Sequence, residues 1–97
     1  MRNFSLIFPD DFDDYAWEVE AKGWLNDVIL ETNGQKFRIM FYDLARLSQD
    51  IESALAINAA FVEKNVVVVP HVTRLAIEQA VQFMAISDGF ARLKSET

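Results

Sequence analysis

Apolar and polar side chains alternate along residues 15–42, and two turn signals divide this stretch into three segments. The first turn is Lys22-Gly23, and the second is Asn33-Gly34, a pair that strongly favours a two-residue β-hairpin. The alternation predicts a three-stranded antiparallel meander with a fixed register, because a slip of one residue would turn every side chain to the other face. Counting outward from the turns gives three rows of partners: Tyr15, Leu30 and Phe37; Trp17, Val28 and Ile39; and Val19, Asn26 and Phe41.

One face of this predicted meander is apolar and the other is acidic. Glu18 is expected opposite Asp27, and Lys36 opposite Glu31 is the one basic neighbour. Like charges across strands cost stability, so packing alone does not explain them. They either keep an open sheet face solvated or form a docking surface for a cationic partner. The acidic face carries Asp14, Glu18, Glu20, Asp27 and Glu31.

Two further strands are predicted outside the meander. Residues 3–8 place their apolar side chains on one side, and Pro9 ends this strand. Residues 66–69 are four valines followed by a proline, which favours a strand covered on both faces. Because residues 43–65 leave room for a helical crossover, the valine strand is predicted to lie parallel to the third meander strand.

Two helices are predicted from their caps and from apolar residues spaced by three and four. Thr73 can cap the second helix, and Ser87-Asp88-Gly89 can end it. Asp43 can cap the first, whose apolar positions are Leu44, Leu47, Ile51, Ala54 and Leu55. The second helix is expected to bury Ile77, Ala80, Val81 and Met84.

Together these elements predict one α+β domain over residues 1–97. Its sheet is expected to have four to five strands and to be mainly antiparallel, built from the meander and the valine-rich strand. Both helices are predicted to pack on one face of the sheet, which leaves the other face partly open.

The acidity of the chain is local. Residues 10–31 hold eight Asp and Glu side chains and one lysine, whereas the whole chain has a net charge of −6. A field of one sign points to a basic protein partner, and a pI near 4.6 argues against nucleic acid, which is bound by Lys and Arg. Cysteine is absent, and the first apolar run is too short for a signal peptide. We expect a soluble, cytoplasmic protein that does not contact a membrane.

Two places in the chain offer candidate catalytic or metal-binding residues. His71 is the only histidine, and a parallel crossover would bring it to the same sheet edge as Asp43. No nucleophile motif or ligand set accompanies these residues, so we expect no catalysis and a loop position for His71. The acidic turn at residues 10–14 lacks the spacing of a calcium loop, so no metal or other cofactor is expected.

Binding is therefore predicted to use carboxylates and one aromatic side chain. Trp24 follows the Gly23 turn and is predicted to be an exposed interface anchor, whereas the other Trp and the Phe residues are assigned to the core. The predicted partner-binding residues are Asp10, Asp11, Asp13, Asp14, Glu18, Glu20, Trp24, Asp27 and Glu31.

In size, acidity and α+β build, the whole chain resembles the immunity proteins of bacterial toxin systems, including those of contact-dependent growth inhibition. These immunity proteins share no common motif, so the resemblance assigns no role to any residue. It implies a cognate toxin, often a nuclease, that the protein neutralises by occlusion.

Two alternatives remain open. The first is a homodimeric structural or regulatory module that pairs through its open sheet face or its valine strand. An apolar patch near residues 66–69, Ile29 and Met40 would favour this alternative, and an unbroken acidic face would favour a different partner. The second is a small enzyme that uses Asp43 and His71, and a pocket lined by both residues would support it.

Overall fold

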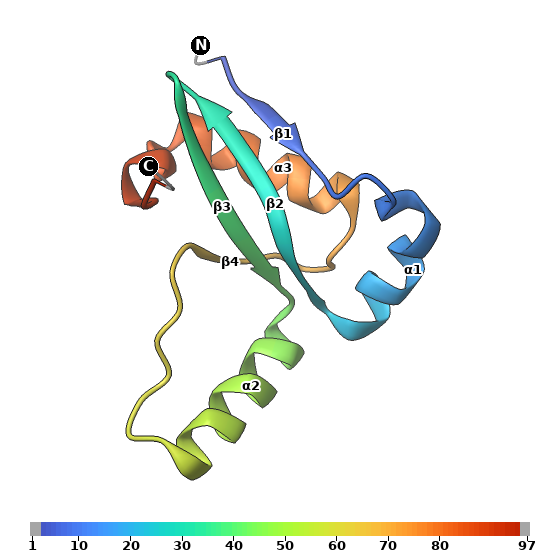
Figure 1. The fold of residues 1–97 in the computed structure, drawn as a ribbon, viewed down its shortest axis with the longest axis vertical. Helices are drawn as coiled ribbons and strands as arrows, with labels where there is room; N and C mark the ends of the chain where they lie inside the picture. The colour runs from blue at the N-terminus through green and yellow to red at the C-terminus, as the bar shows by residue number, and fades with distance from the viewer. Residues whose placement is uncertain (1–2, 96–97) are drawn as a thin grey trace.

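The computed structural model describes residues 3–95 and contains a four-stranded mixed sheet in the order β1-β2-β3-β4 (Figure 1). Three α-helices and a short 3₁₀-helix, η1, complete the α+β fold. No helix in this described range is long and apolar enough to cross a bilayer. The elements are β1 (Ser5–Ile7), α1 (Phe12–Lys22), β2 (Trp24–Thr32), β3 (Gln35–Tyr42), α2 (Leu44–Ile57), β4 (Val66–Val68), α3 (Arg74–Ile86) and η1 (Gly89–Arg92).

The β2–β3 hairpin confirms the predicted Asn33-Gly34 turn. Asn33 and Gly34 have φ values of 54° and 75°, the two positive angles that a type I′ turn requires. Val28 pairs with Ile39, and Leu30 pairs with Phe37, as predicted. Towards the other end of the hairpin the register shifts at a bulge, so Phe41 faces Leu25 and the predicted pairing of Phe41 with Asn26 is wrong.

Residues 15–21, predicted to be the first meander strand, belong to helix α1 instead, as does Lys22 of the predicted turn. Phe12, Ala16 and Val19 follow helical spacing and pack in the core, and this burial outweighs the alternation of the segment. Gly23 does not form a hairpin: its φ of 74° ends the helix, and its N–H donates to the Val19 carbonyl at 2.9 Å. The predicted pairings of Tyr15, Trp17 and Val19 with β2 are therefore wrong.

Strand β1 takes the place beside β2 that the predicted first meander strand would have filled. It runs antiparallel to β2, with Leu6 opposite Leu30, and so confirms the predicted N-terminal strand. Its three residues cover only one end of β2, and α1 lies beside the other end (Figure 1).

Strand β4 lies parallel to β3, with Met40 opposite Val66 and Tyr42 opposite Val68, as the crossover predicted. The valines are not covered on both faces, because α3 and η1 cover only one face of the sheet and α2 does not cover the other. Val67 packs against the core, whereas the Val68 side chain is 47% exposed. The prediction of a fully buried strand is therefore wrong.

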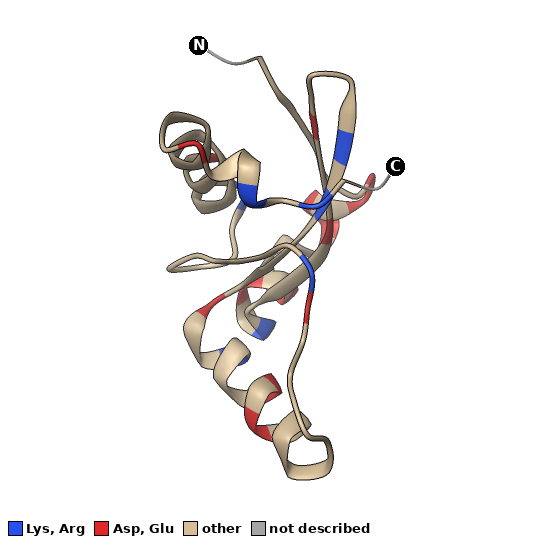
Figure 2. Ribbon diagram, turned by 90° about the vertical axis from the view of Figure 1, so that its left-hand side faces the viewer, with Lys and Arg blue, Asp and Glu red and all other residues tan. Residues whose placement is uncertain are grey.

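Helix α3 covers one face of the sheet together with η1, and the view in Figure 2 places both on the same side. Thr73 caps the helix as predicted, since its Oγ1 accepts the Ala76 N–H at 3.2 Å. The left-handed residue beyond the helix is Asp88, with a φ of 63°, and the chain then folds Phe90 back onto the core. The helix buries Ile77, Val81 and Met84 against the sheet.

Helix α2 forms as predicted but does not share the covered face with α3. It projects beyond the end of the sheet (Figure 1), and none of its residues is buried. Leu44 is 69% exposed and Leu55 is 52% exposed. The space on the covered face is already filled by Ile77, Val81 and Phe90, so the prediction that two helices pack there is wrong.

Candidate functional site

Six of the nine predicted partner-binding residues lie on α1 or in the turn that precedes it. The turn carries Asp10 and Asp11, and the helix carries the other four together with Lys22. Asp13 and Asp14 occupy the first helical turn, where carboxylates are stabilised by the helix dipole. We define the acidic α1 surface as Asp10, Asp11, Asp13, Asp14, Glu18 and Glu20 together with Trp17; all are exposed except Glu18, which is half-buried.

Trp17 is a candidate site residue, and its predicted place in the core is wrong. It is 70% exposed because Phe12, Ala16 and Val19 take the buried side of α1. Glu20 lies one helical turn further along and shares the exposed side. An exposed tryptophan among carboxylates combines a large apolar contact with an electrostatic field. Helical spacing, had it been preferred over alternation, would have identified this residue.

Two contacts fix the start of α1 against α3. The Arg74 guanidinium donates to Asp13 Oδ1 at 3.1 Å. The same guanidinium lies over the rings of Phe8 and Phe12, at 4.2 and 5.2 Å from their centroids. Phe12 is fully buried, so this end of the helix is held by packing as well as by charge.

Asp11 also contacts the tyrosine at the kink of α1. Burial, then the charge of Asp11 and a hydrogen bond to its carboxylate, raise the pKa of Tyr15 above 10.0. The neutral phenol therefore remains a hydrogen-bond donor to Asp11 across the neutral pH range. This contact links the acidic turn to the helix.

Asp27 and Glu31 lie apart from this surface, on the open face of the sheet, and both are paired. Arg38 from β3 contacts Asp27, and Lys36 lies 3.8 Å from Glu31. Exposed ion pairs of this kind add little stability, but their basic members place positive charges among the carboxylates of the open face. Figure 2 shows acidic and basic residues spread over several elements. The prediction of one acidic sheet face that gathers Glu18, Glu20, Asp27 and Glu31 is therefore wrong.

Trp24 is not an exposed anchor, so this prediction is also wrong. It is half-buried at the start of β2, its Nε1 atom is enclosed by protein, and the Arg46 guanidinium lies 5.6 Å from its ring centroid. Tyr42 faces it across the β2–β3 pair and is only 3% exposed. Burial, and then Asp50, raise the pKa of Tyr42. Trp24 is part of the structure that supports α2.

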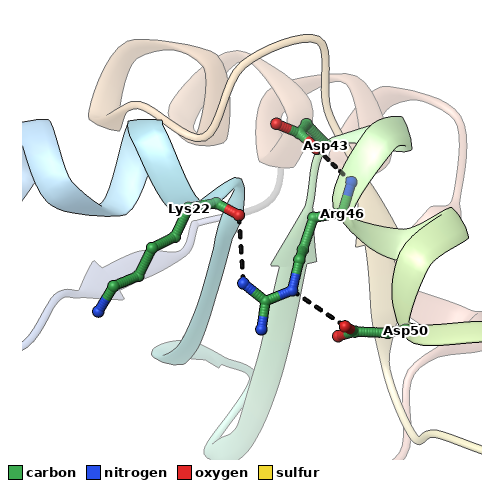
Figure 3. A network of polar contacts seen from close by, with 4 residues as sticks. All are labelled: Lys22, Asp43, Arg46 and Asp50. Carbon is green, nitrogen blue, oxygen red and sulfur yellow. Dashed lines mark hydrogen bonds and ion pairs between the residues drawn. The ribbon is translucent and has the colours of Figure 1, made fainter. Parts of the chain in front are cut away.

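Arg46 connects the end of α1 to the start of α2 (Figure 3). Its side chain donates to Asp50 Oδ1 at 3.0 Å and to the Lys22 carbonyl at 3.4 Å. Its backbone N–H donates to Asp43 Oδ1 at 2.8 Å, which confirms the predicted cap of α2. The contacts with Asp43 and Asp50 stabilise the first turns of α2, and the contact with Lys22 joins the base of α2 to the end of α1.

Asp43 and His71 do not form a site. The Asp43 carboxylate is occupied in capping α2 and lies beside Gly23, while His71 is exposed in the loop before α3. Within residues 3–95 no hydrogen bond or ion pair joins them. The same range contains no group of three or more His, Cys, Asp and Glu residues arranged to hold a metal ion.

Comparison of the chain with protein-family models, with curated proteins and with solved structures finds no match.

Proposed function

We propose that this protein works by binding a basic protein partner through the acidic α1 surface, with Trp17 as the central anchor. The observation that carries the proposal is the 70% exposure of Trp17 within a segment that holds six carboxylates and one lysine. Tryptophan is strongly enriched among the few residues that supply most of the affinity at protein interfaces. Docking would remove the apolar surface of this large side chain from water, which favours association.

The surrounding charge favours a cationic partner in particular. Carboxylates at the rim of an interface attract a basic protein over several ångströms and accelerate its association. Asp13 has a partner in Arg74, but it remains 83% exposed and can still contribute to the field. The acid and the anchor thus act at different stages, the acid in encounter and Trp17 in the lifetime of the complex.

The helix that carries this surface is already formed in the free protein. Phe12 and Val19 bury one side of α1, Arg74 holds its start, and Gly23 ends it in a left-handed conformation. A preformed helix loses little conformational entropy on docking, which favours affinity.

Among basic partners, we propose a cognate bacterial toxin that the protein neutralises as an immunity protein. A toxin that acts on nucleic acid needs a cationic cleft, and an acidic helix with an aromatic anchor is complementary to such a cleft. Support for this role comes from the small single domain and from the capping role of Asp43, which leaves the second alternative, an enzyme using Asp43 and His71, without a site.

The proposal is tested by capture and by protection. Tagged protein should retain a basic partner from the cells that produce it, and co-expression should protect those cells when that partner is toxic. Trp17→Ala should lower the affinity by about 2 kcal/mol, or about thirtyfold. Leu75→Ala is the matched control, because Leu75 is 65% exposed and lies outside the acidic α1 surface. Equal loss of affinity in both variants, or in neither, would contradict the proposal.

A further inference from the structure

Strand β4 is an open edge of the sheet. In the parallel pairing with β3, the Asn65 carbonyl accepts the Met40 N–H at 3.0 Å, and the Val69 N–H donates to the Tyr42 carbonyl at 2.8 Å. This pattern turns the backbone groups of Val67 towards β3 and those of Val66 and Val68 away from it. No hydrogen bond from another group within residues 3–95 reaches those outward amides and carbonyls.

Proteins keep such edges single with charged side chains, prolines, bulges, a covering segment or a very short strand. Strand β4 is short, but its three residues include no charged side chain, proline or bulge. Strand β4 consists of three valines, and Val68 is 47% exposed. Both the backbone and the side chains therefore favour the addition of another strand.

Apolar surface continues from this edge onto α3. A groove of about 630 Å³ lies between them, lined by the valines of β4 and by Phe83 and Met84. Phe83 is 70% exposed and Ile86 is 88% exposed, on a helix whose opposite side already fills the core. Three paired residues alone would bury too little surface for a stable interface, which takes about 800 Å² from each partner, so these side chains would have to contribute.

The register of the edge suits a second copy of the same chain. If β4 pairs antiparallel with β4 of another molecule about a two-fold axis at Val67, Val66 of each copy faces Val68 of the other. All the outward groups of both strands are then hydrogen-bonded, and Val67 meets its own equivalent in a non-hydrogen-bonded pair. The groove is lined by both Glu63 and Arg92, so this edge does not repel a copy as the acidic α1 surface would.

We propose that the protein forms a two-fold symmetric homodimer in which β4 pairs with β4, joining the two four-stranded sheets into one. This inference uses a different surface from the proposed function and does not depend on it. Both acidic α1 surfaces remain free in such a dimer, because α1 lies beside β2, away from β4 (Figure 1).

The first test measures the oligomeric state of the whole chain by light scattering or sedimentation over the micromolar range. The wild-type protein should be a dimer, and Val68→Lys should lower its association constant at least about tenfold, since it places a charge at the pairing edge. Ile7→Lys is the matched control, because Ile7 is 44% exposed and lies on β1, the opposite edge of the same sheet. A monomeric wild type, or a dimer that only Ile7→Lys disrupts, would overturn the proposal.

A cross-linking test locates the two-fold axis. The described chain has no cysteine, so a single Val67→Cys variant can form a disulfide only with another copy. A non-hydrogen-bonded antiparallel pair brings Cα atoms to about 4.5 Å, a separation that a disulfide can span. Mild oxidation should yield covalent dimers of Val67→Cys much faster than of Val68→Cys, although Val68 is the more exposed residue. Equal rates in two folded variants would place the axis elsewhere and overturn the proposed register.

Discussion

Substituting Gly23 by alanine should destabilise the fold through two separate effects. Its φ of 74° is left-handed, which costs a residue with a Cβ atom about 1 kcal/mol. The added Cβ would also lie 2.6 Å from Cγ of Asp43, so the Asp43 side chain must move. That displacement breaks the cap on α2, which contributes about 1 kcal/mol. We expect Gly23→Ala to lower the free energy of unfolding by about 2 to 3 kcal/mol.

Gly34→Ala is the matched control for this prediction. Gly34 has nearly the same φ, 75°, but no atom lies within 4 Å of the Cβ that alanine would add. This variant should therefore lose only the backbone contribution, about 1 kcal/mol. Urea denaturation followed by circular dichroism gives both values from the midpoint and the slope of the transition.

A double variant separates the two effects. In Gly23→Ala/Asp43→Ala the carboxylate that the new Cβ would displace is already absent. The loss of unfolding free energy in this double variant should therefore be smaller, by about 1 kcal/mol, than the sum of the losses in the two single variants. Equal losses in Gly23→Ala and Gly34→Ala, together with additivity in the double variant, would show that the junction of α1 and α2 is not as described.

Three further predictions concern the tyrosines, Arg46 and His71. Because the pKa values of Tyr15 and Tyr42 are raised in the folded state, the stability that they provide is fully present below about pH 10 and is lost as the pH rises through the raised values. The absorbance of the phenolates should show a higher titration midpoint in the folded than in the unfolded protein, and the unfolding free energy should fall over the same pH range. Equal midpoints in the folded and the unfolded chain would contradict this prediction. Arg46→Ala removes the ion pair with Asp50 and the link to α1, and should lower the unfolding free energy by about 1 kcal/mol in a urea titration. His71→Ala should change the stability by less than about 0.5 kcal/mol and leave partner capture intact; loss of capture in a folded variant would refute this.

Local signals explain which elements were predicted correctly. The Asn33-Gly34 turn needs two positive φ angles that this pair readily supplies, so the hairpin and its near register follow from the sequence. Asp43 and Thr73 cap α2 and α3 with their own side chains, which is also a local interaction. The parallel crossover follows from the length of the connection and the handedness of such units.

Helix α1 was mistaken for a strand because its sequence satisfies two periods. Tyr15, Trp17 and Val19 alternate, while Phe12, Ala16 and Val19 follow the helical spacing. The choice between them depends on which side chains reach the core, and this is a tertiary property. A glycine with positive φ occurs both in hairpin turns and at the ends of helices, so Gly23 does not distinguish a strand from a helix before it.

The candidate site was found only in part for the same reason. The acidic segment is evident from composition, but the helix separates its first six carboxylates from Asp27 and Glu31 on the sheet. The direction of α2, which encloses Trp24, depends on long-range contacts of Arg46. The helical spacing of Phe12, Ala16 and Val19 leaves Trp17 on the exposed side of α1, but no local signal shows that Trp24 is half-buried.

The most direct test of the central claim is the association rate of the partner as a function of ionic strength. Asp14→Lys/Glu20→Lys reverses two charges on the acidic α1 surface, and Glu52→Lys/Glu78→Lys reverses two exposed charges on α2 and α3. Both variants change the net charge equally, so any difference between them reports position. The first should slow association and flatten its dependence on salt, while the second should leave both close to wild type. Similar behaviour of the two variants, or a rate insensitive to salt in the wild type, would contradict a partner that docks on α1.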